Sequence, residues 1–215
     1  MKLVVGNCNY SSWSLRGWLA ARQTGADFET VVIDLDTPEF KSEVARHSSA
    51  GRVPVLVDGD ITVWDSLAII EYLAEQYPDC GLWPADKAAR AFARSVSAEM
   101  HSGFPDVRNH WPMNIRRPIA ERPATEGAAR DTARITEIWR EARKCFGQDG
   151  PFLCGAFGAI DCVFAPVASR FRTYGVELGP VEAAYVDAIH AHPPMVEWIA
   201  AAKKETWVVV ADEVD

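Results

Sequence analysis

The feature of this sequence that most constrains its fold is a change in apolar pattern shortly after residue 80. Before that point, short β-branched and apolar runs alternate with stretches of helical spacing, whereas from Lys87 onward the spacing is helical with little β-branched density. Alternating strands and helices build a mixed α/β layer, and a run of helices builds a separate helical module. We therefore expect an α/β domain over residues 1–79 and an all-helical domain over residues 86–215, with a ligand cleft at the seam between them.

The first part of the chain predicts the order βαβ, a polar connecting segment, and then ββα. Strands are expected over residues 3–5, 30–33, 53–57 and 61–64, and helices over residues 15–23 and 66–76. Asp58-Gly59-Asp60 joins the last two strands and predicts a tight hairpin, because glycine readily adopts the positive φ that such turns require. The proline-rich stretch 78–84 ends this part of the chain.

Charge and composition argue against several classes of function. The net charge of −8 at pH 7 disfavours electrostatic binding to nucleic acid or to an anionic membrane. No stretch approaches the roughly 20 apolar residues that cross a bilayer, and no charged-then-apolar leader opens the sequence. We therefore expect a cytoplasmic protein that works on small molecules.

The cysteines and histidines give no indication of a disulfide framework or a metal site. The five cysteines are odd in number and contain no Cys-x-x-Cys pair. The five histidines form no cluster with acids or cysteines at the spacing of metal ligands. We expect free thiols and no bound metal.

The stretch NYSSWSLRGW, residues 9–18, places three serines between the first strand and the first helix. Serine is among the best N-caps of a helix, so these hydroxyls have an ordinary structural explanation. The free N–H groups and the dipole of a helix N-terminus also favour negative charge, so the same hydroxyls suit an anionic ligand atom. The residues alone leave both explanations open.

The stretch GRVPVLVDGDITVWDSLAIIEYL, residues 51–73, carries two further features. Pro54 opens a strand, where its missing N–H is tolerated. A cis Val53-Pro54 bond there would turn the backbone N–H and C=O of Val53 outward, free to pair with a peptide ligand as an added strand. The alternative is a proline that only opens the strand.

The second feature is Asp65-Ser66, which follows a strand and begins a helix. Asp65 can simply cap that helix. Alternatively, the free N–H groups and the Ser66 hydroxyl can hold a ligand carboxylate while Asp65 pairs with a ligand ammonium. A free α-amino acid head group carries both of these charges.

Together, SSWSLR, GRVPVL, DSLAIIEYL and an all-helical second half resemble the cytosolic glutathione transferase family over essentially the whole chain. The resemblance implies a thioredoxin-like domain that binds glutathione and a helical domain that completes the pocket for a small electrophile. It also implies a homodimer. SSWSLR is most similar to the serine-type zeta class, whose signature runs Ser-Ser-Cys-x-x-Arg, with Trp13 here in place of the cysteine.

The resemblance implies that Ser11 or Ser12 supplies the hydroxyl that faces the glutathione sulfur. A hydrogen bond from such a hydroxyl at a helix N-terminus favours the thiolate and lowers the pKa of the thiol. Counting back from Arg16, Ser11 occupies the zeta-like position, which we favour slightly, and Ser12 the position used by the delta and theta classes. Ser14 is expected to be a structural hydroxyl.

The resemblance also implies how the rest of glutathione is held. Val53 would pair with the cysteinyl backbone, Pro54 would hold the bend, and Asp65 with Ser66 would hold the γ-glutamyl end. The glycyl carboxylate needs a cation or an amide donor, for which the candidates are Lys41, Arg46, His47 and Arg52.

In the second half, the resemblance places a capping acid at Asp161, in the window Gly158-Ala159-Ile160-Asp161, and we expect this residue to be structural. The electrophile pocket has six candidate residues, each of which has an ordinary role in the core or on the surface as its alternative. They are Trp111, Met113, Asn114, Arg116, Arg170 and Arg172.

We therefore predict an enzyme, a glutathione transferase of the detoxification type that activates the glutathione thiolate for attack on a small electrophile. One alternative is a glutathione-dependent cis–trans isomerase of the maleylacetoacetate type. Another is a module that binds glutathione or a protein without turnover. A disulfide reductase is disfavoured, because Ser11 and Ser14 stand where reactive cysteines would be needed.

Overall fold

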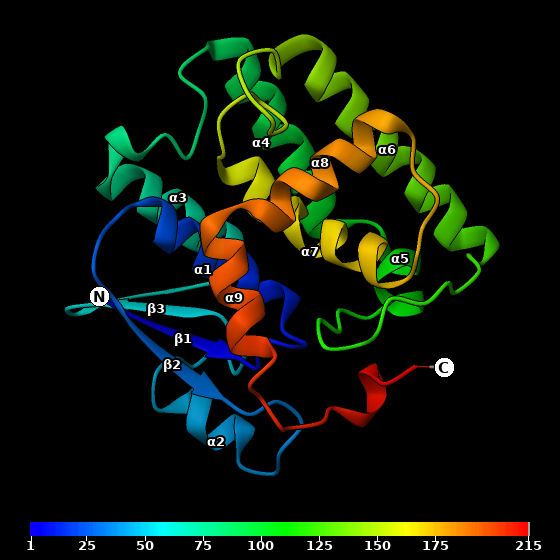
Figure 1. Cartoon of the computed structure of the whole chain (residues 1–215). Helices are drawn as coiled ribbons and strands as arrows, with labels where there is room; N and C mark the ends of the chain where they lie inside the picture. The colour runs from blue at the N-terminus through cyan, green and yellow to red at the C-terminus, as the bar shows by residue number, and fades with distance from the viewer. Residues whose placement is uncertain (215) are drawn as a thin grey trace.

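The computed structural model describes residues 1–214, and a four-stranded sheet organises the first part of the chain (Figure 1). The strands are β1 (Lys2–Gly6), β2 (Glu29–Ile33), β3 (Val55–Asp58) and β4 (Ile61–Trp64), in the order β2-β1-β3-β4. β1 pairs in parallel with β2 and antiparallel with β3, and β3 pairs antiparallel with β4. The expected hairpin is confirmed, with Gly59 at a φ of 58°.

Helices cover both faces of this sheet. They are α1 (Ser12–Gln23), α2 (Phe40–Ala45) and α3 (Ser66–Gln76), followed by the short 3₁₀ turn η1 (Pro78–Cys80). Because side chains alternate across a strand, Leu3 and Val5 face α1 and α3, whereas Val4 packs with Val44 of α2 on the other face. The connecting segment that we expected to be only polar thus contains a short helix whose Val44 is fully buried.

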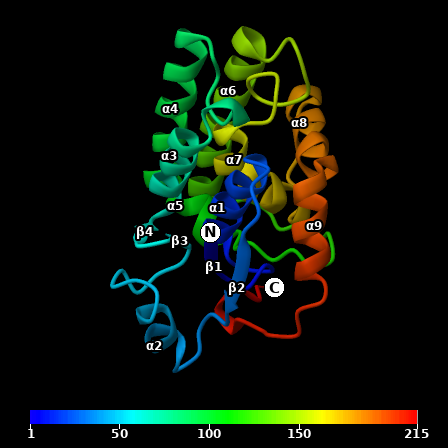
Figure 2. The same cartoon turned by 90° about the vertical axis from the view of Figure 1, so that its left-hand side faces the viewer.

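The second part of the chain is helical, as its spacing predicts. Its helices are α4 (Lys87–Ser102), α5 (Pro105–His110), α6 (Glu126–Phe146), α7 (Ala159–Thr173), α8 (Pro180–Ala191) and α9 (Pro193–Ala202), with the 3₁₀ turn η2 (Val210–Asp212). These helices lie on the side of the sheet that α1 and α3 cover, and α2 lies on the opposite side (Figures 1 and 2). The predicted fold class, a thioredoxin-like α/β part followed by an all-helical part, is therefore confirmed. None of the helices formed by residues 1–214 is long and apolar enough to cross a membrane.

Helix α7 is the centre of the molecule. Every residue of α7 except Arg172 is buried, and the helix packs against α1, α4 and α8. One continuous apolar cluster therefore includes Leu15 and Leu19 of α1 together with Phe164 and Phe171 of α7. The α/β part and the helical part share a core rather than meeting at a polar seam.

Asp161 caps α7 from inside the protein, as expected. Its carboxylate accepts hydrogen bonds from the backbone N–H groups of Leu153 at 3.1 Å and Gly158 at 3.0 Å. Burial raises the pKa of Asp161 from 3.8 to about 7, while these two hydrogen bonds oppose the shift. The role of this acid is structural.

The segment after α9, residues 203–214, crosses back over the loop between β1 and α1, and we call it the C-terminal strap (Figure 1). The carboxylate of Glu205 accepts hydrogen bonds from the backbone N–H groups of Cys8 at 2.6 Å and Asn9 at 3.0 Å. Further along, Glu213 accepts a hydrogen bond of 2.5 Å from the Tyr10 hydroxyl. The strap fixes the loop that leads into α1.

The Asp161 cap predicts a defined effect on stability. Asp161→Ala leaves two buried N–H groups without an acceptor, so it should lower the free energy of unfolding by at least about 2 kcal/mol at pH 5. Because the folded-state pKa is raised, the stabilising contribution of Asp161 is lost as pH rises from 3.8 through about 7. Denaturant unfolding should therefore show a larger gap between wild type and variant at pH 5 than at pH 8.

Asp86→Ala is the matched control, because Asp86 caps α4 at the surface through a 2.8 Å hydrogen bond from Ala89. It should cost about 1 kcal/mol. The structural assignment of Asp161 is wrong if its substitution costs no more than this control, or if the gap widens between pH 5 and pH 8.

Candidate functional site

A cavity of about 560 Å³ lies where the loop before β3, the start of α3 and the end of α4 meet. The four residues to which the resemblance gave the backbone and γ-glutamyl ends of glutathione line it, namely Val53, Pro54, Asp65 and Ser66, and so does Arg52. The remaining lining residues are Trp13, Ala50, Trp64 and His101. Of the four candidates for holding a terminal carboxylate, Arg52 alone is among the described residues that line this cavity.

The Val53-Pro54 bond is cis, as the sequence analysis predicted. Pro54 lies directly against α1, because a Cβ built at Gly17 would come within 3.3 Å of the Pro54 ring. Gly17 therefore lets the Val53-Pro54 turn approach the helix that carries the serines. A larger side chain at this position would have to move the proline, so glycine is what allows the close approach.

Asp65 and Ser66 form the polar end of the cavity. Asp65 has a φ of 74°, which is uncommon for any residue other than glycine, and its Oδ1 caps α3 by accepting from the N–H of Leu67 at 2.8 Å. The other oxygen, Oδ2, lies 3.2 Å from Nε2 of His101. The Ser66 hydroxyl is buried and has no hydrogen-bond partner among residues 1–214.

His101 is a site residue that the sequence analysis missed. It comes from α4, so the helical part contributes directly to a cavity built on the α/β part. Burial lowers the pKa of His101, and the positive charges of Arg16 and Arg108 lower it further, while Asp65 opposes the shift. Nothing in its local sequence pattern indicates this contact, which depends on the packing of α4 beside α3.

Trp13 lines the cavity and also contacts two arginines. Its ring lies edge-on to the His101 ring, with centroids 5.0 Å apart. The guanidinium carbon of Arg16 lies 4.4 Å from the Trp13 ring centroid, and that of Arg108 lies 4.8 Å from it. Both distances fit cation–π contact.

The arginines near Trp13 form a positively charged interior. Arg16 is fully buried, and all three of its guanidinium nitrogens lack a hydrogen-bond partner among the described residues. Burial holds the pKa of Arg16 well below its usual value, and repulsion from Arg108 and Arg170 adds to the shift. Arg170 donates to the carbonyl of Trp111 at 2.7 Å, and burial lowers its pKa to about 9.

A guanidinium without an anionic partner is costly to bury. The acid that acts on Arg16 is Asp65, at the polar end of the cavity. The site therefore combines one carboxylate, one free hydroxyl and an excess of positive charge.

The two candidate serines have different surroundings. Ser11 is the N-cap of α1, and its Oγ accepts from the N–H of Ser14 at 3.4 Å and donates to the Ser14 Oγ at 2.7 Å. Ser14 in turn accepts from the N–H of Gly6 at 3.0 Å, so it is the structural hydroxyl that we expected. Ser12 is the first residue of α1, and within residues 1–214 its hydroxyl forms no hydrogen bond.

Capping therefore explains Ser11 but not Ser12. Neither serine is among the residues that line the cavity, whereas Trp13, which follows them, is. The hydroxyl that is free to bond a ligand belongs to Ser12.

The six candidates for an electrophile pocket do not converge. Arg170 belongs to the arginine group near Trp13, Met113 lies in the core, and the Nδ2 group of Asn114 donates to Glu213 of the strap at 2.9 Å. Arg116 and Arg172 line a separate cavity at the other side of α7.

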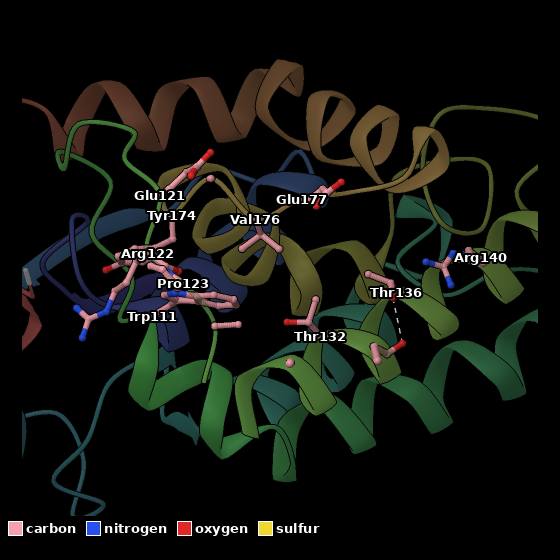
Figure 3. A pocket seen from close by; sticks show the side chains of 14 residues that line it. Trp111, Glu121, Arg122, Pro123, Thr132, Thr136, Arg140, Tyr174, Val176 and Glu177 are labelled. Carbon is pink, nitrogen blue, oxygen red and sulfur yellow. Dashed lines mark hydrogen bonds between the residues drawn. The ribbon is translucent and has the colours of Figure 1, made fainter. Parts of the chain in front are cut away.

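Trp111 lines yet another cavity, of about 680 Å³, between α6 and residues 174–177 (Figure 3). Figure 3 shows Trp111 and Tyr174 at one end of this cavity and Arg140 at the other, with Thr132 and Thr136 of α6 between them. None of the residues assigned to glutathione binding lines it.

The five cysteines are all free, and burial together with the charge of Glu205 raises the pKa of Cys8 to about 12. Cys8 is therefore a poor nucleophile, although it lies in the loop next to the serines. Over residues 1–214, no group of three or more histidine, cysteine, aspartate or glutamate side chains is arranged to hold a metal ion.

Curated relatives of this chain include a probable maleylacetoacetate isomerase of Caenorhabditis elegans, 40% identical over 99 residues that cover 46% of this chain and 45% of that protein. Glutathione S-transferase Z1 of Arabidopsis thaliana is 34% identical over 113 residues, which cover 52% of this chain and 50% of that protein. The chain thus spans about half the length of the curated relatives it matches.

Solved structures share the fold over nearly the whole chain. A glutathione transferase homologue from Burkholderia, solved with bound glutathione, superposes with a TM-score of 0.72 at 24% identity and covers 95% of this chain and 98% of that one. A maleyl pyruvate isomerase described as a bacterial zeta-class glutathione S-transferase gives a TM-score of 0.69 at 24% identity, covering 95% of this chain and 99% of that one.

Two family models match the two parts of the chain separately. The glutathione S-transferase N-terminal domain matches residues 10–76, and the glutathione S-transferase C-terminal domain matches residues 125–201. The first match contains the cis turn and the Asp65-Ser66 helix start, and the second contains the Asp161 cap. The chain therefore belongs to the glutathione S-transferase family.

Proposed function

We propose that this protein is a glutathione transferase that binds glutathione in the 560 Å³ cavity and activates its thiolate for attack on a small electrophile. The observation that carries the proposal is that the cis Val53-Pro54 turn, Asp65 and Ser66 lie together in one cavity beside the N-terminus of α1. The glutathione-bound relative of the same fold supports it. We propose a glutathione-binding domain over residues 1–79 and an all-helical domain over residues 86–215 that completes the electrophile site, and we keep the homodimer and the cytoplasmic location as predictions.

The polar groups of the cavity suit the γ-glutamyl end of glutathione. The Ser66 hydroxyl is buried without a partner, and the N-terminus of α3 adds N–H groups and a favourable dipole, so both fit a carboxylate. Asp65 fits the ammonium. The lowered pKa of His101 favours a neutral ring, so its contact with Asp65 leaves the carboxylate charge available to a cation.

The thiol end is assigned to Ser12. Glutathione supplies the nucleophilic sulfur, and the Ser12 hydroxyl at the first residue of α1 would donate a hydrogen bond to its thiolate. The positive end of the helix dipole and the buried guanidinium of Arg16 favour the same charge state. We therefore assign thiolate activation to Ser12 and helix capping to Ser11.

A second candidate function is glutathione-dependent cis–trans isomerisation of an acidic electrophile, of the maleylacetoacetate type. The observation that favours it is the unpaired positive charge of Arg16 with Arg108 and Arg170, which suits a carboxylate on the substrate. The C. elegans relative, a probable maleylacetoacetate isomerase, and the maleyl pyruvate isomerase of the same fold support the same substrate chemistry. A glutathione-binding module without turnover would give binding without thiolate formation.

The assignment of the head-group site predicts a loss of glutathione affinity. Asp65→Asn and Ser66→Ala should each raise the Kd for glutathione roughly tenfold or more at pH 7, because a hydrogen bond to a charged group contributes about 1.5–3 kcal/mol. Isothermal titration calorimetry measures the effect. Asp60→Asn, in the exposed hairpin outside the cavity, is the control and should bind like wild type. Unchanged affinity in both test variants would show that the head group is held elsewhere.

The two serines should respond differently to removal of their hydroxyls. Ser12→Ala should raise the pKa of bound glutathione's thiol and move the acid limb of the kcat profile upward, at about 1.4 kcal/mol per pKa unit, while glutathione still binds. Ser11→Ala should mainly lower the melting temperature, because a lost cap costs about 1 kcal/mol. Thiolate absorbance in the ultraviolet, followed against pH, separates the two effects. The assignment is reversed if Ser11→Ala alone shifts the profile.

The buried arginines predict discrimination between charged and neutral electrophiles. Arg108→Met should lower kcat/KM for an α,β-unsaturated carboxylate by about tenfold or more and leave its methyl ester nearly unchanged. Arg130→Met, an exposed substitution on α6, is the control. If acid and ester lose activity in parallel, the arginines do not select an acidic substrate.

A further inference from the structure

A cavity of about 370 Å³ lies among the end of α7, the helix α9 and the loop 115–119, and it shares no lining residue with the proposed glutathione site. Five of its lining residues are basic: Arg116, Arg117, Arg172, His190 and Lys203. No aspartate or glutamate lines it. We call it the basic cavity.

Burial lowers the pKa of His190 to about 4, so its ring is neutral at pH 7. Three of the four remaining basic residues have no acidic partner among residues 1–214. Arg116 donates to the backbone carbonyls of Glu205 and Trp207 and to the Tyr10 hydroxyl, all of which are neutral. Arg117 donates to the carbonyl of Val214, and its buried Nε has no partner among the described residues. The side chain of Lys203 is exposed and forms no ion pair in the described part of the chain.

The nearby carboxylates are already engaged. Asp187 pairs with Arg172. Glu205 accepts from the backbone amides of Cys8 and Asn9, and Glu213 accepts from Tyr10 and Asn114. Arg116, Arg117 and Lys203 therefore form no ion pair with an aspartate or glutamate of the described structure.

Other arginines of the chain do form ion pairs, although Arg16, Arg108 and Arg170 form none among the described residues. Six arginines of this acidic chain form ion pairs with aspartate or glutamate, namely Arg22, Arg94, Arg130, Arg134, Arg140 and Arg172. The ends of α7, α8 and α9 meet near the cavity, and helix dipoles account for the basic residues at those ends. They do not account for Arg116 and Arg117, which lie on a loop.

We propose that the basic cavity binds a small phosphate-class anion, either free phosphate or the phosphate group of a small ester. Planar guanidinium groups and a lysine ammonium are the donors that proteins use for such oxyanions. Ser169 and Thr173 add hydroxyl groups to the lining, and Ile115, Ile119 and Ile199 form an apolar wall against which an ester group can pack. The volume lies at the lower end of the range for small-molecule sites.

The inference does not depend on glutathione chemistry, and calorimetry on the full chain tests it. Inorganic phosphate and phenyl phosphate are titrated separately at constant ionic strength, with and without saturating glutathione. We expect saturable one-to-one binding that glutathione does not weaken. Lys203→Ala and Arg117→Met should weaken it at least tenfold. Lys204→Ala is the matched control, because it removes a neighbouring exposed cation that does not line the cavity.

The outcomes separate the possibilities. Tighter binding of phenyl phosphate indicates an ester and equal binding indicates the free anion, and either supports the site. The proposal is overturned if neither anion binds saturably at millimolar concentration. It is also overturned if Lys204→Ala weakens binding as much as Lys203→Ala, since that indicates diffuse attraction. Loss of binding in Arg52→Met, or in the presence of glutathione, would place the anion in the other cavity and exclude this one.

Discussion

The packing of α1 against α7 is the contact on which the rest of the structure depends. α1 carries the serines at its first turn, and α7 is the most deeply buried helix, so their shared apolar cluster fixes the α/β part relative to the helical part. This contact also determines which side chain of α4 reaches the cavity beside the sheet, namely that of His101. Asp161 supports it from within, because the buried start of α7 would otherwise leave N–H groups without acceptors.

The elements with local patterns could be predicted from the sequence. The hairpin at Gly59, the helix start at Asp65 and the turn at Val53-Pro54 each depend on a few neighbouring residues, and each is present in the structure. The short helix α2 was missed because one buried residue, Val44, is too weak a signal among polar neighbours. His101 and the convergence of Arg16, Arg108 and Arg170 could not be predicted, because they depend on how separate helices pack.

Adjacent serines show how a helix N-terminus can hold two roles at once. The hydroxyl of Ser11 donates a hydrogen bond to Ser14, which accepts another from the backbone of β1. These bonds fix the first turn of α1 relative to β1. The hydroxyl of the next residue, Ser12, forms no hydrogen bond among the described residues. The two explanations that the sequence left open, capping and ligand binding, are therefore compatible, because they fall on adjacent residues.

The strap determines when, during synthesis, the loop before α1 can form its final hydrogen bonds. The loop before α1 is held by Glu205 and Glu213, which lie 197 and 203 positions later in the chain than the residues they bond. During synthesis on a ribosome, the serines therefore emerge long before the groups that fix their loop. This loop therefore gains its final hydrogen bonds only after residues 205–213 have left the ribosome.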